Sequence, residues 1–208
     1  MAKYNGPVCR LCRREGQKLF LKGERCFTDK CGIERRAFPP GQHGQKRTKL
    51  SEYGTQLREK QKVKRVYGLM ERQLRNTFDR AARERGVTSD IFFKNLECRL
   101  DNVVYRMGFA RTRQEAKQLV RHNHFLVNGK RLNIPSAAIG TGDEIAVIEK
   151  SKAGSTFKLA SELYSKKVAL NWFEVDHTKL AGKVVSLPTR EDLHFDVKER
   201  LIVELYNK

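Results

Sequence analysis

The chain has 208 residues, which suits one large domain or two small ones. Lysine and arginine together number 43 against 24 aspartates and glutamates, so the formal net charge is +19 and the isoelectric point is near 10.0. A charge of this size is typical of proteins that bind polyanions. The sequence shows neither an apolar run long enough to cross a bilayer nor a secretory leader, which argues against the membrane and secreted classes. We therefore expect a protein of a reducing, cytoplasmic compartment that binds nucleic acid.

The positive charge is concentrated at the N-terminus. The first 50 residues contain 13 basic and 4 acidic side chains, a net charge of +9, which is almost half of the total excess. We expect this segment to touch phosphate groups extensively. The cations expected to do so are Arg13, Arg14, Arg35, Arg36, Lys46 and Arg47.

Four cysteines lie in the same segment, with the spacing C-x2-C-x13-C-x4-C. Two close pairs separated by a short loop are typical of structural zinc sites, in which four thiolates surround one ion. Two disulfides, an iron–sulfur cluster or free thiols are the alternatives, and iron in the same cage stays open. Catalytic zinc is not expected, because four protein ligands would leave no open position. The predicted ligands are Cys9, Cys12, Cys26 and Cys31, whereas Cys98 is expected to be a small buried apolar residue.

Residues 46–97 are predicted to be helical. Two prolines and two glycines at 39–44 indicate an extended loop, after which Ser51 can cap a helix that ends near Gly68. A second helix follows up to Gly86, with apolar residues spaced for one buried face, and a short third helix leads to Leu96. We expect this helical domain to be completed by a terminal helix within residues 190–208.

Residues 98–150 show the pattern of a small α/β unit. A helix over 100–107 ends at Gly108, and Thr112 with Glu115 forms a capping box that opens the next helix. A strand over 125–127 is followed by Asn128-Gly129, which predicts a tight hairpin turn. A further strand is expected over 144–149.

The stretch from 151 to 189 is less regular. Residues 151–165 are expected to form a flexible or weakly helical connector. Residues 170–187 predict another hairpin, which we expect to cross over at Gly182.

Basic residues recur on the predicted helices of the central unit. Arg113, Lys117 and Arg121 are spaced four residues apart and should form one stripe opposite the apolar face, beside the helix N-terminus that attracts phosphate. Arg99 and Arg106 are expected to share a face of the preceding helix, and Asp101 is expected to be a local ion-pair partner. The predicted RNA contacts beyond the N-terminal segment are Arg58, Lys62, Arg65, Arg99, Arg106, Arg111, Thr112, Arg113, Lys117, Arg121, His122, His124 and Asn128.

Several of these stretches resemble a known family. Residues 99–113 (RLDNVVYRMGFARTR), Val127-Asn128-Gly129 and Gly142-Asp143 resemble the RNA-binding module named after ribosomal protein S-four. Residues 39–44 (PPGQHG) and 53–62 extend the resemblance to the bacterial S-four family over essentially the whole chain, and the cysteine segment is similar to the zinc-bearing variant of that family. Asn123 departs from the pattern, because glycine is common at that position.

The resemblance implies an α+β fold. A mostly helical domain with an N-terminal zinc-binding segment (1–45), formed by 46–97 and 190–208, would be interrupted by an inserted small α/β RNA-binding module with antiparallel hairpins. The inserted domain would cover 98–189, with its core module at 98–150.

The resemblance also implies a function without enzymatic activity. The chain would be a structural component of the small ribosomal subunit, a primary binder of 16S ribosomal RNA that nucleates assembly and contributes to translational accuracy. Its cofactor would be one structural zinc ion. Its partners would be ribosomal protein S-five, other small-subunit proteins and messenger RNA near the channel by which it enters the subunit, with neither a membrane nor a small-molecule substrate.

Two other classes of protein remain alternatives. The same module anchors some RNA-modifying enzymes, which would need a separate catalytic pocket. A free RNA chaperone or stress factor would share the basic surface, but it would not co-purify stoichiometrically with small subunits.

Overall fold

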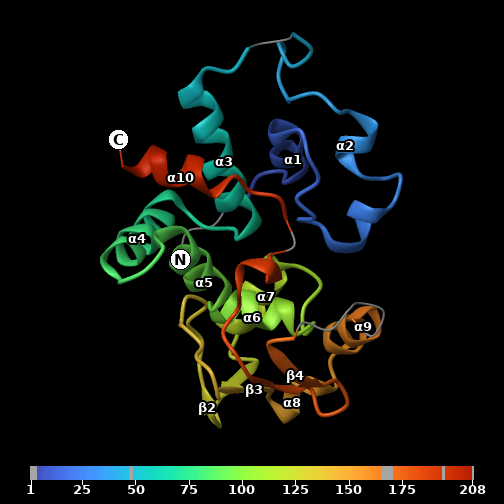
Figure 1. The fold of residues 1–208 in the computed structure, drawn as a ribbon. Helices are drawn as coiled ribbons and strands as arrows, with labels where there is room; N and C mark the ends of the chain where they lie inside the picture. The colour runs from blue at the N-terminus through green and yellow to red at the C-terminus, as the bar shows by residue number, and fades with distance from the viewer. Residues whose placement is uncertain (1–3, 47–48, 165–170, 194, 208) are drawn as a thin grey trace. The chain divides into compact units, whose positions relative to one another are not determined.

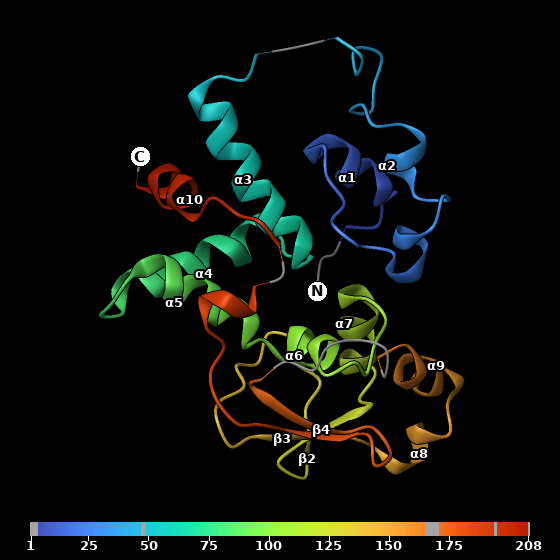
Figure 2. The same cartoon turned by 45° about the vertical axis from the view of Figure 1, so that its right-hand side comes forward.

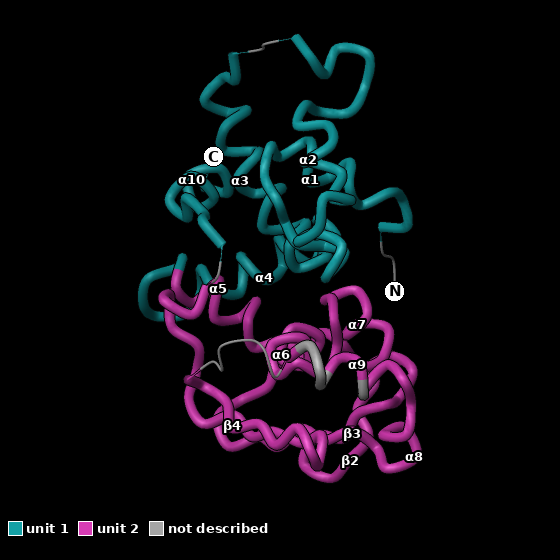
Figure 3. The backbone as a smooth tube through the Cα atoms, turned by 90° about the vertical axis from the view of Figure 1, so that its right-hand side faces the viewer, with its two compact units in different colours: residues 1–89, 195–208 teal, residues 90–194 magenta. Residues whose placement is uncertain are grey.

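The structure is a computed structural model that describes residues 4–46, 49–164, 171–193 and 195–207 (Figure 1). The chain forms two compact units, one from residues 1–89 and 195–208 and the other from residues 90–194 (Figure 3). In the parts of the chain that are described, no helix has the length and apolar character needed to cross a membrane. Whether residues 98–189 fold as an independent domain stays a prediction.

Unit 1 is helical. Helix α3 (Glu52–Val66) begins at Ser51, whose Oγ accepts a hydrogen bond from the Gly54 N–H at 3.1 Å. Helix α4 (Glu71–Arg83) buries Leu74, Phe78 and Ala81, as the sequence pattern predicted.

The terminal helix α10 (Glu199–Tyr206) completes this helical unit by packing on α3. The Gln56 amide donates to Glu204 Oε2 at 3.3 Å, and the Tyr206 ring stacks on Phe78 with ring centroids 4.4 Å apart. Two stretches separated by more than 100 residues therefore share one core.

The N-terminal segment has only short elements. These are α1 (Cys9–Glu15), the 3₁₀-helix η1 (Gly23–Phe27) and α2 (Gly32–Arg35). Helix α1 packs against both α2 and α3, so the segment belongs to unit 1.

Unit 2 contains a mixed helical and sheet fold. Helix α5 (Thr88–Glu97) leads into it, followed by α6 (Leu100–Arg106) and α7 (Arg113–Arg121). Gly108 ends α6 with φ of +82°, and a Cβ at this position would lie 2.2 Å from the Tyr164 ring, so only glycine fits.

The five strands form one antiparallel sheet in the order β2-β1-β3-β5-β4, and their bounds are β1 Phe125–Val127, β2 Lys130–Arg131, β3 Glu144–Val147, β4 Phe173–Asp176 and β5 Ala181–Val184. Helices α6 and α7 cover one face of the sheet (Figure 1, Figure 2). The core between them is apolar and includes Leu100, Val104, Phe125, Ile145 and Trp172. The predicted helical part with a small module of antiparallel hairpins is thus confirmed.

The turns of unit 2 show one confirmed prediction and one error. Asn128 and Gly129 both have positive φ, +49° and +76°, as a tight hairpin turn requires. Gly182 does not form the second turn; it lies inside β5, paired with Ile145 and Val175. A Cβ there would lie 3.1 Å from Met107 Sδ, so this glycine is needed for close packing.

The connector at 151–165, predicted as flexible or weakly helical, is helical in the residues that the structure describes. It includes the end of α8 (Glu149–Lys152) and α9 (Ser155–Tyr164), and Phe157 of α9 is buried in the core of unit 2. Asn123 stands where glycine is common in the family, and the backbone explains why asparagine is accepted there. Its φ is +61°, a conformation that asparagine tolerates.

The remaining short helix, η2 (Arg190–Asp192), lies near the end of unit 2.

Candidate RNA-binding surface and cysteine cluster

The N-terminus of α7 is built by a variant of the predicted capping box. Thr112 Oγ1 accepts a hydrogen bond from the Glu115 N–H at 3.2 Å, which satisfies one of the unpaired amides of the first turn. Glu115 reaches one residue further back than the motif predicts, because its Oε2 accepts the Arg111 N–H at 2.8 Å. The same carboxylate pairs with the Arg111 guanidinium at 2.8 Å, so Arg111 is held beside the helix start.

Arg113 is the best oriented cation of the module. Its Nε donates to Asn102 Oδ1 at 2.8 Å, and its guanidinium carbon lies 4.5 Å from the centroid of the Tyr105 ring. Asn102 is itself fixed, because its amide donates to the Glu97 carboxylate at 2.6 Å. A half-buried guanidinium that is held on two sides is preorganised for contact with phosphate.

Arg99 and Arg106 do not lie where the sequence pattern placed them. Both are buried, with 7% and 6% of their surface exposed, and each donates two hydrogen bonds to a carboxylate. Arg99 binds Asp101 at 3.1 and 2.9 Å, and Arg106 binds Glu97 at 2.9 and 2.8 Å. A buried cation is stable only when it is paired, so these two arginines support the fold rather than form an outward array.

The stripe on α7 is also interrupted. Arg121 is exposed and Arg113 is half-buried, but Lys117 is buried, with 8% of its surface exposed. Lys117 is one of the three buried residues of α7, together with Ala116 and Val120, so helical spacing alone did not predict which cations of the stripe are exposed.

The predicted polar contacts of the hairpin are used within the fold. Asn128 Nδ2 donates to Asp143 Oδ1 at 2.8 Å, and its Oδ1 accepts the Glu144 N–H at 2.9 Å. His124 Nδ1 lies 2.8 Å from Ser151 Oγ, and burial, followed by the charge of His122, lowers the pKa of His124. His122 is exposed and keeps its side chain at the surface.

Two further cations were missed by the sequence analysis. Lys130 and Arg131 form the exposed edge strand β2, directly after the Asn128-Gly129 turn. The sequence did contain a signal for these two cations, namely a pair of basic residues directly after a predicted tight turn. Arg111, Arg121 and His122 are exposed as well, and so are Lys150, Lys179, Lys183 and Arg190 elsewhere in unit 2.

The predicted cations of α3 are tied to neighbouring elements of unit 1. Arg58 and Arg65 both pair with Glu15 of α1, a carboxylate whose side chain is only 2% exposed. Burial raises the pKa of Glu15, and the charge of Arg65 opposes that rise. Lys62 is buried and donates to the Asp196 carbonyl at 3.1 Å.

The N-terminal cations are mostly at the surface. Arg13 is the exception, since its Nε donates to the Phe38 carbonyl at 3.0 Å and its guanidinium lies over the Phe38 ring. Arg47 lies outside the described residues. Among the predicted RNA contacts of this segment, the exposed cations are Arg14, Arg35, Arg36 and Lys46.

The four cysteines of the N-terminal segment lie near one another and are not joined by disulfides. Cys12, Cys26 and Cys31 are each 7% exposed, and Cys9 is half-buried. Burial raises the pKa of the Cys12 thiol, a hydrogen bond with the Leu19 backbone lowers it, and the neighbouring Cys26, Cys9 and Cys31 raise it further. The Lys22 N–H donates to Cys26 Sγ at 3.4 Å, a contact typical of a thiolate ligand.

This donor set suits a soft divalent ion, because four thiols gather in one sheltered place. Nevertheless, among the residues that the structure describes, no three or more cysteine, histidine or carboxylate side chains stand at ligand geometry for a metal ion. The fold alone therefore does not establish the predicted zinc-binding segment.

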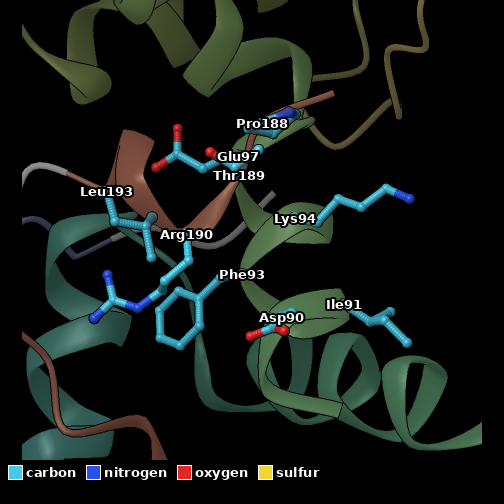
Figure 4. Close-up of a pocket in the computed structure, with 9 residues that line it drawn as sticks. All are labelled: Asp90, Ile91, Phe93, Lys94, Glu97, Pro188, Thr189, Arg190 and Leu193. Atoms are coloured by element: carbon cyan, nitrogen blue, oxygen red, sulfur yellow. The ribbon is translucent and has the colours of Figure 1, made fainter. Parts of the chain in front are cut away.

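A small cavity in unit 2 lies between α5 and the segment 188–193 (Figure 4). Its volume is about 260 Å³, just below the size that is usual for small-molecule sites. Glu97 on its wall is already bound by Arg106, so this carboxylate is not available as a base. The lining residues are Asp90, Ile91, Phe93, Lys94, Glu97, Pro188, Thr189, Arg190 and Leu193.

Two family matches cover most of the chain. Residues 3–97 match the family described as "Ribosomal protein S4/S9 N-terminal domain", and residues 98–145 match the "S4 domain". The chain belongs to this ribosomal protein family. Its relatives include proteins described as "Small ribosomal subunit protein uS4", which it covers over their full length and its own. It is 58% identical to that of Caldicellulosiruptor saccharolyticus, 56% to that of Heliobacterium modesticaldum and 54% to that of Halothermothrix orenii.

The S4 domain match ends inside β3, whereas the sheet continues beyond it. The strands β1 and β2 and the first half of β3 lie within the matched residues, and the later hairpin adds β5 and β4 to the edge of β3. The later hairpin therefore covers the edge of β3, and β4 becomes the outer strand on that side of the sheet.

Proposed function

We propose that this chain is a structural, non-enzymatic component of the small ribosomal subunit that binds ribosomal RNA. The observation that supports this most strongly is 58% identity over all 208 residues to a small ribosomal subunit protein. The family consists of ribosomal proteins, so the alternative of an RNA-modifying enzyme is set aside.

The mode of binding follows from the side chains at the surface. Arg111 and Arg113 are held beside the start of α7, and Arg121, Lys130 and Arg131 are exposed near it in the chain. These groups suit phosphates, and folded RNA is recognised mainly by its shape, its phosphates and its 2′-hydroxyl groups.

The finer role is that of a primary binder of 16S ribosomal RNA that nucleates subunit assembly and contributes to translational accuracy. A module whose cations are already oriented loses little conformational entropy on binding, which favours early attachment. Ribosomal protein S-five, other small-subunit proteins and messenger RNA near its channel into the subunit are the further partners that this role implies.

The test is a salt titration of binding to a 16S ribosomal RNA transcript, with an unrelated structured RNA of equal length for comparison. Replacing Arg111 or Arg121 by alanine should weaken binding and reduce the slope of log K against log salt by about one per residue. Arg200→Ala is the matched control, because Arg200 is an exposed arginine on α10 that is paired with Glu204. Equal affinity for both RNAs, or slopes that match the control, would refute the proposal.

We also propose that Cys9, Cys12, Cys26 and Cys31 bind one structural zinc ion. Their gathering in a sheltered place supports this, and the metal would supply folding stability to a segment with few apolar residues. Elemental analysis of freshly purified, reduced protein should find one zinc per chain. Cys26→Ala should abolish it, whereas Cys98→Ser should keep it. A stoichiometric iron content, or no metal at all, would contradict the assignment.

A further inference from the structure

Two phenylalanines in the cysteine segment stack on each other at the surface. The ring centroids of Phe20 and Phe27 are 5.0 Å apart with an angle of 29° between the ring planes. Nevertheless, 43% of Phe20 and 70% of Phe27 is exposed to solvent. Two large apolar rings that pack on each other outside the core are unusual in a segment with so little apolar material to bury.

The backbone holds the pair in this outward position. Leu19 is 5% exposed and belongs to the interior, whereas the next residue, Phe20, has φ of +51°. A bulky side chain rarely adopts this left-handed conformation, and strain of this kind concentrates at functional sites. The Lys22 N–H to Cys26 Sγ hydrogen bond closes the loop between the two rings.

Cations lie in the same short loop. Lys22, Arg25 and Lys30 are all exposed, within a 50-residue segment of net charge +9. The Arg25 guanidinium is positioned, because its Nε donates to the Lys30 carbonyl at 3.3 Å. Aromatic faces next to positioned cations are the combination by which proteins hold unpaired nucleotides, with bases on the rings and phosphates on the cations.

We propose that the Phe20–Phe27 pair is a stacking platform for an unpaired base of RNA, with Arg25 and Lys30 beside it for the adjacent phosphates. This rests on the proposed binding of ribosomal RNA and assigns one contact within it. An apolar protein partner would cover the rings equally well, but the charge of the surrounding loop favours a polyanion.

The experiment uses the full chain as purified under reducing conditions and two RNA probes. One probe is a 16S ribosomal RNA transcript with its unpaired loops, and the other is a fully paired duplex of the same length. Phe27→Leu removes the aromatic face but keeps an apolar side chain, and it should weaken binding to the transcript roughly 5- to 150-fold. Binding to the duplex should not change, and Phe27→Trp should restore the affinity for the transcript.

Two controls separate stacking from structure. Tyr53→Leu removes another exposed aromatic ring, 59% exposed, and should leave the affinity unchanged. Phe20→Gly relieves the left-handed backbone, so a purely structural role predicts equal or higher thermal stability with unaltered binding. The platform predicts weaker binding in this variant, even though its thermal stability is not reduced.

The outcomes distinguish this inference from the proposed function. If the natural chain prefers the transcript but Phe27→Leu binds it equally well, the platform is refuted and the proposed function stands. If the natural chain shows no preference for ribosomal RNA, the proposed function is refuted, and the platform that rests on it is refuted as well. If Phe27→Leu loses only its association with another small-subunit protein, the rings form a protein contact and the inference is overturned.

Discussion

Single side chains in unit 2 divide into those that support the fold and those available to RNA. Arg106 is bound to Glu97 by two hydrogen bonds, and both side chains are almost fully buried. Arg106→Ala would leave the buried Glu97 carboxylate without the cation that pairs with it, so we expect the free energy of unfolding to fall by about 3–5 kcal/mol. Equilibrium denaturation in urea measures this change.

Two comparisons make the Arg106 result specific. Arg121→Ala alters an exposed residue and should change the free energy of unfolding by less than about 0.5 kcal/mol. The double variant Glu97→Gln and Arg106→Gln removes both charges and should be more stable than Arg106→Ala. If Arg106→Ala proves as stable as Arg121→Ala, the pair does not support the fold.

Cys98 provides a second prediction at this scale. Burial raises the pKa of its thiol to about 11, so below that pH the reactive thiolate is scarce. At pH 8 we expect iodoacetamide to modify Cys98 in the folded protein at least roughly 100-fold more slowly than in urea, because a thiol of ordinary pKa is ionised about 100 times more. Mass spectrometry of the peptide reports the rate, and rapid labelling of folded protein would show that the thiol is accessible.

At the scale of elements, the β1–β2 hairpin depends on its two turn residues. Gly129→Ala places a Cβ on a backbone with φ of +76° and should cost about 1–2 kcal/mol. Asn128→Ala removes both side-chain hydrogen bonds, to the Asp143 carboxylate and the Glu144 N–H, and also replaces a residue that tolerates positive φ by one that does not. Asn128→Gly removes the same two hydrogen bonds but keeps the tolerance of positive φ. We expect thermal melting to rank Asn128→Gly above Asn128→Ala in stability. The reverse order would show that the left-handed backbone at position 128 does not determine the stability of the turn.

The spacing of apolar residues and the residues that cap helices predicted most of the helices and strands. The helices at 52–66, 71–83 and 113–121 each combine an apolar face with a starting or ending signal in the nearby sequence. Gly182 was misplaced, because a glycine in a strand and a glycine in a turn look alike until the contact with Met107 is known. The segment 151–165 was predicted as flexible or weakly helical, and its packing was not predicted because Phe157 is buried against residues distant in the sequence.

The candidate surface was harder to predict than the fold. Asp101 was predicted as a local ion-pair partner and does bind Arg99, but nothing in the spacing of Arg99 and Arg106 shows that these two cations are buried while Arg111 and Arg121 are exposed. Composition predicts a basic molecule, but only tertiary contacts decide which cations face the solvent.

Over the whole molecule, the cysteine segment and the central module depend on different forces. The segment is held to α3 by the buried Glu15, which pairs with Arg58 and Arg65, and otherwise by the proposed zinc ion. The central module has a large apolar core between α6, α7 and the sheet. Removal of the metal should therefore affect the two regions very differently.

We expect a chelator to loosen residues 4–46 while leaving residues 98–147 folded. Hydrogen exchange followed by mass spectrometry should show faster exchange in the first region and unchanged protection in the second, since the apolar core of the module does not depend on the metal. Cys26→Ala should reproduce the chelator's effect without chelator, and Cys98→Ser should respond to the chelator as the natural chain does. Equal loss of protection in both regions would mean that the chain unfolds as one cooperative body, and unchanged exchange at 4–46 would mean that packing around Glu15 suffices to order the segment.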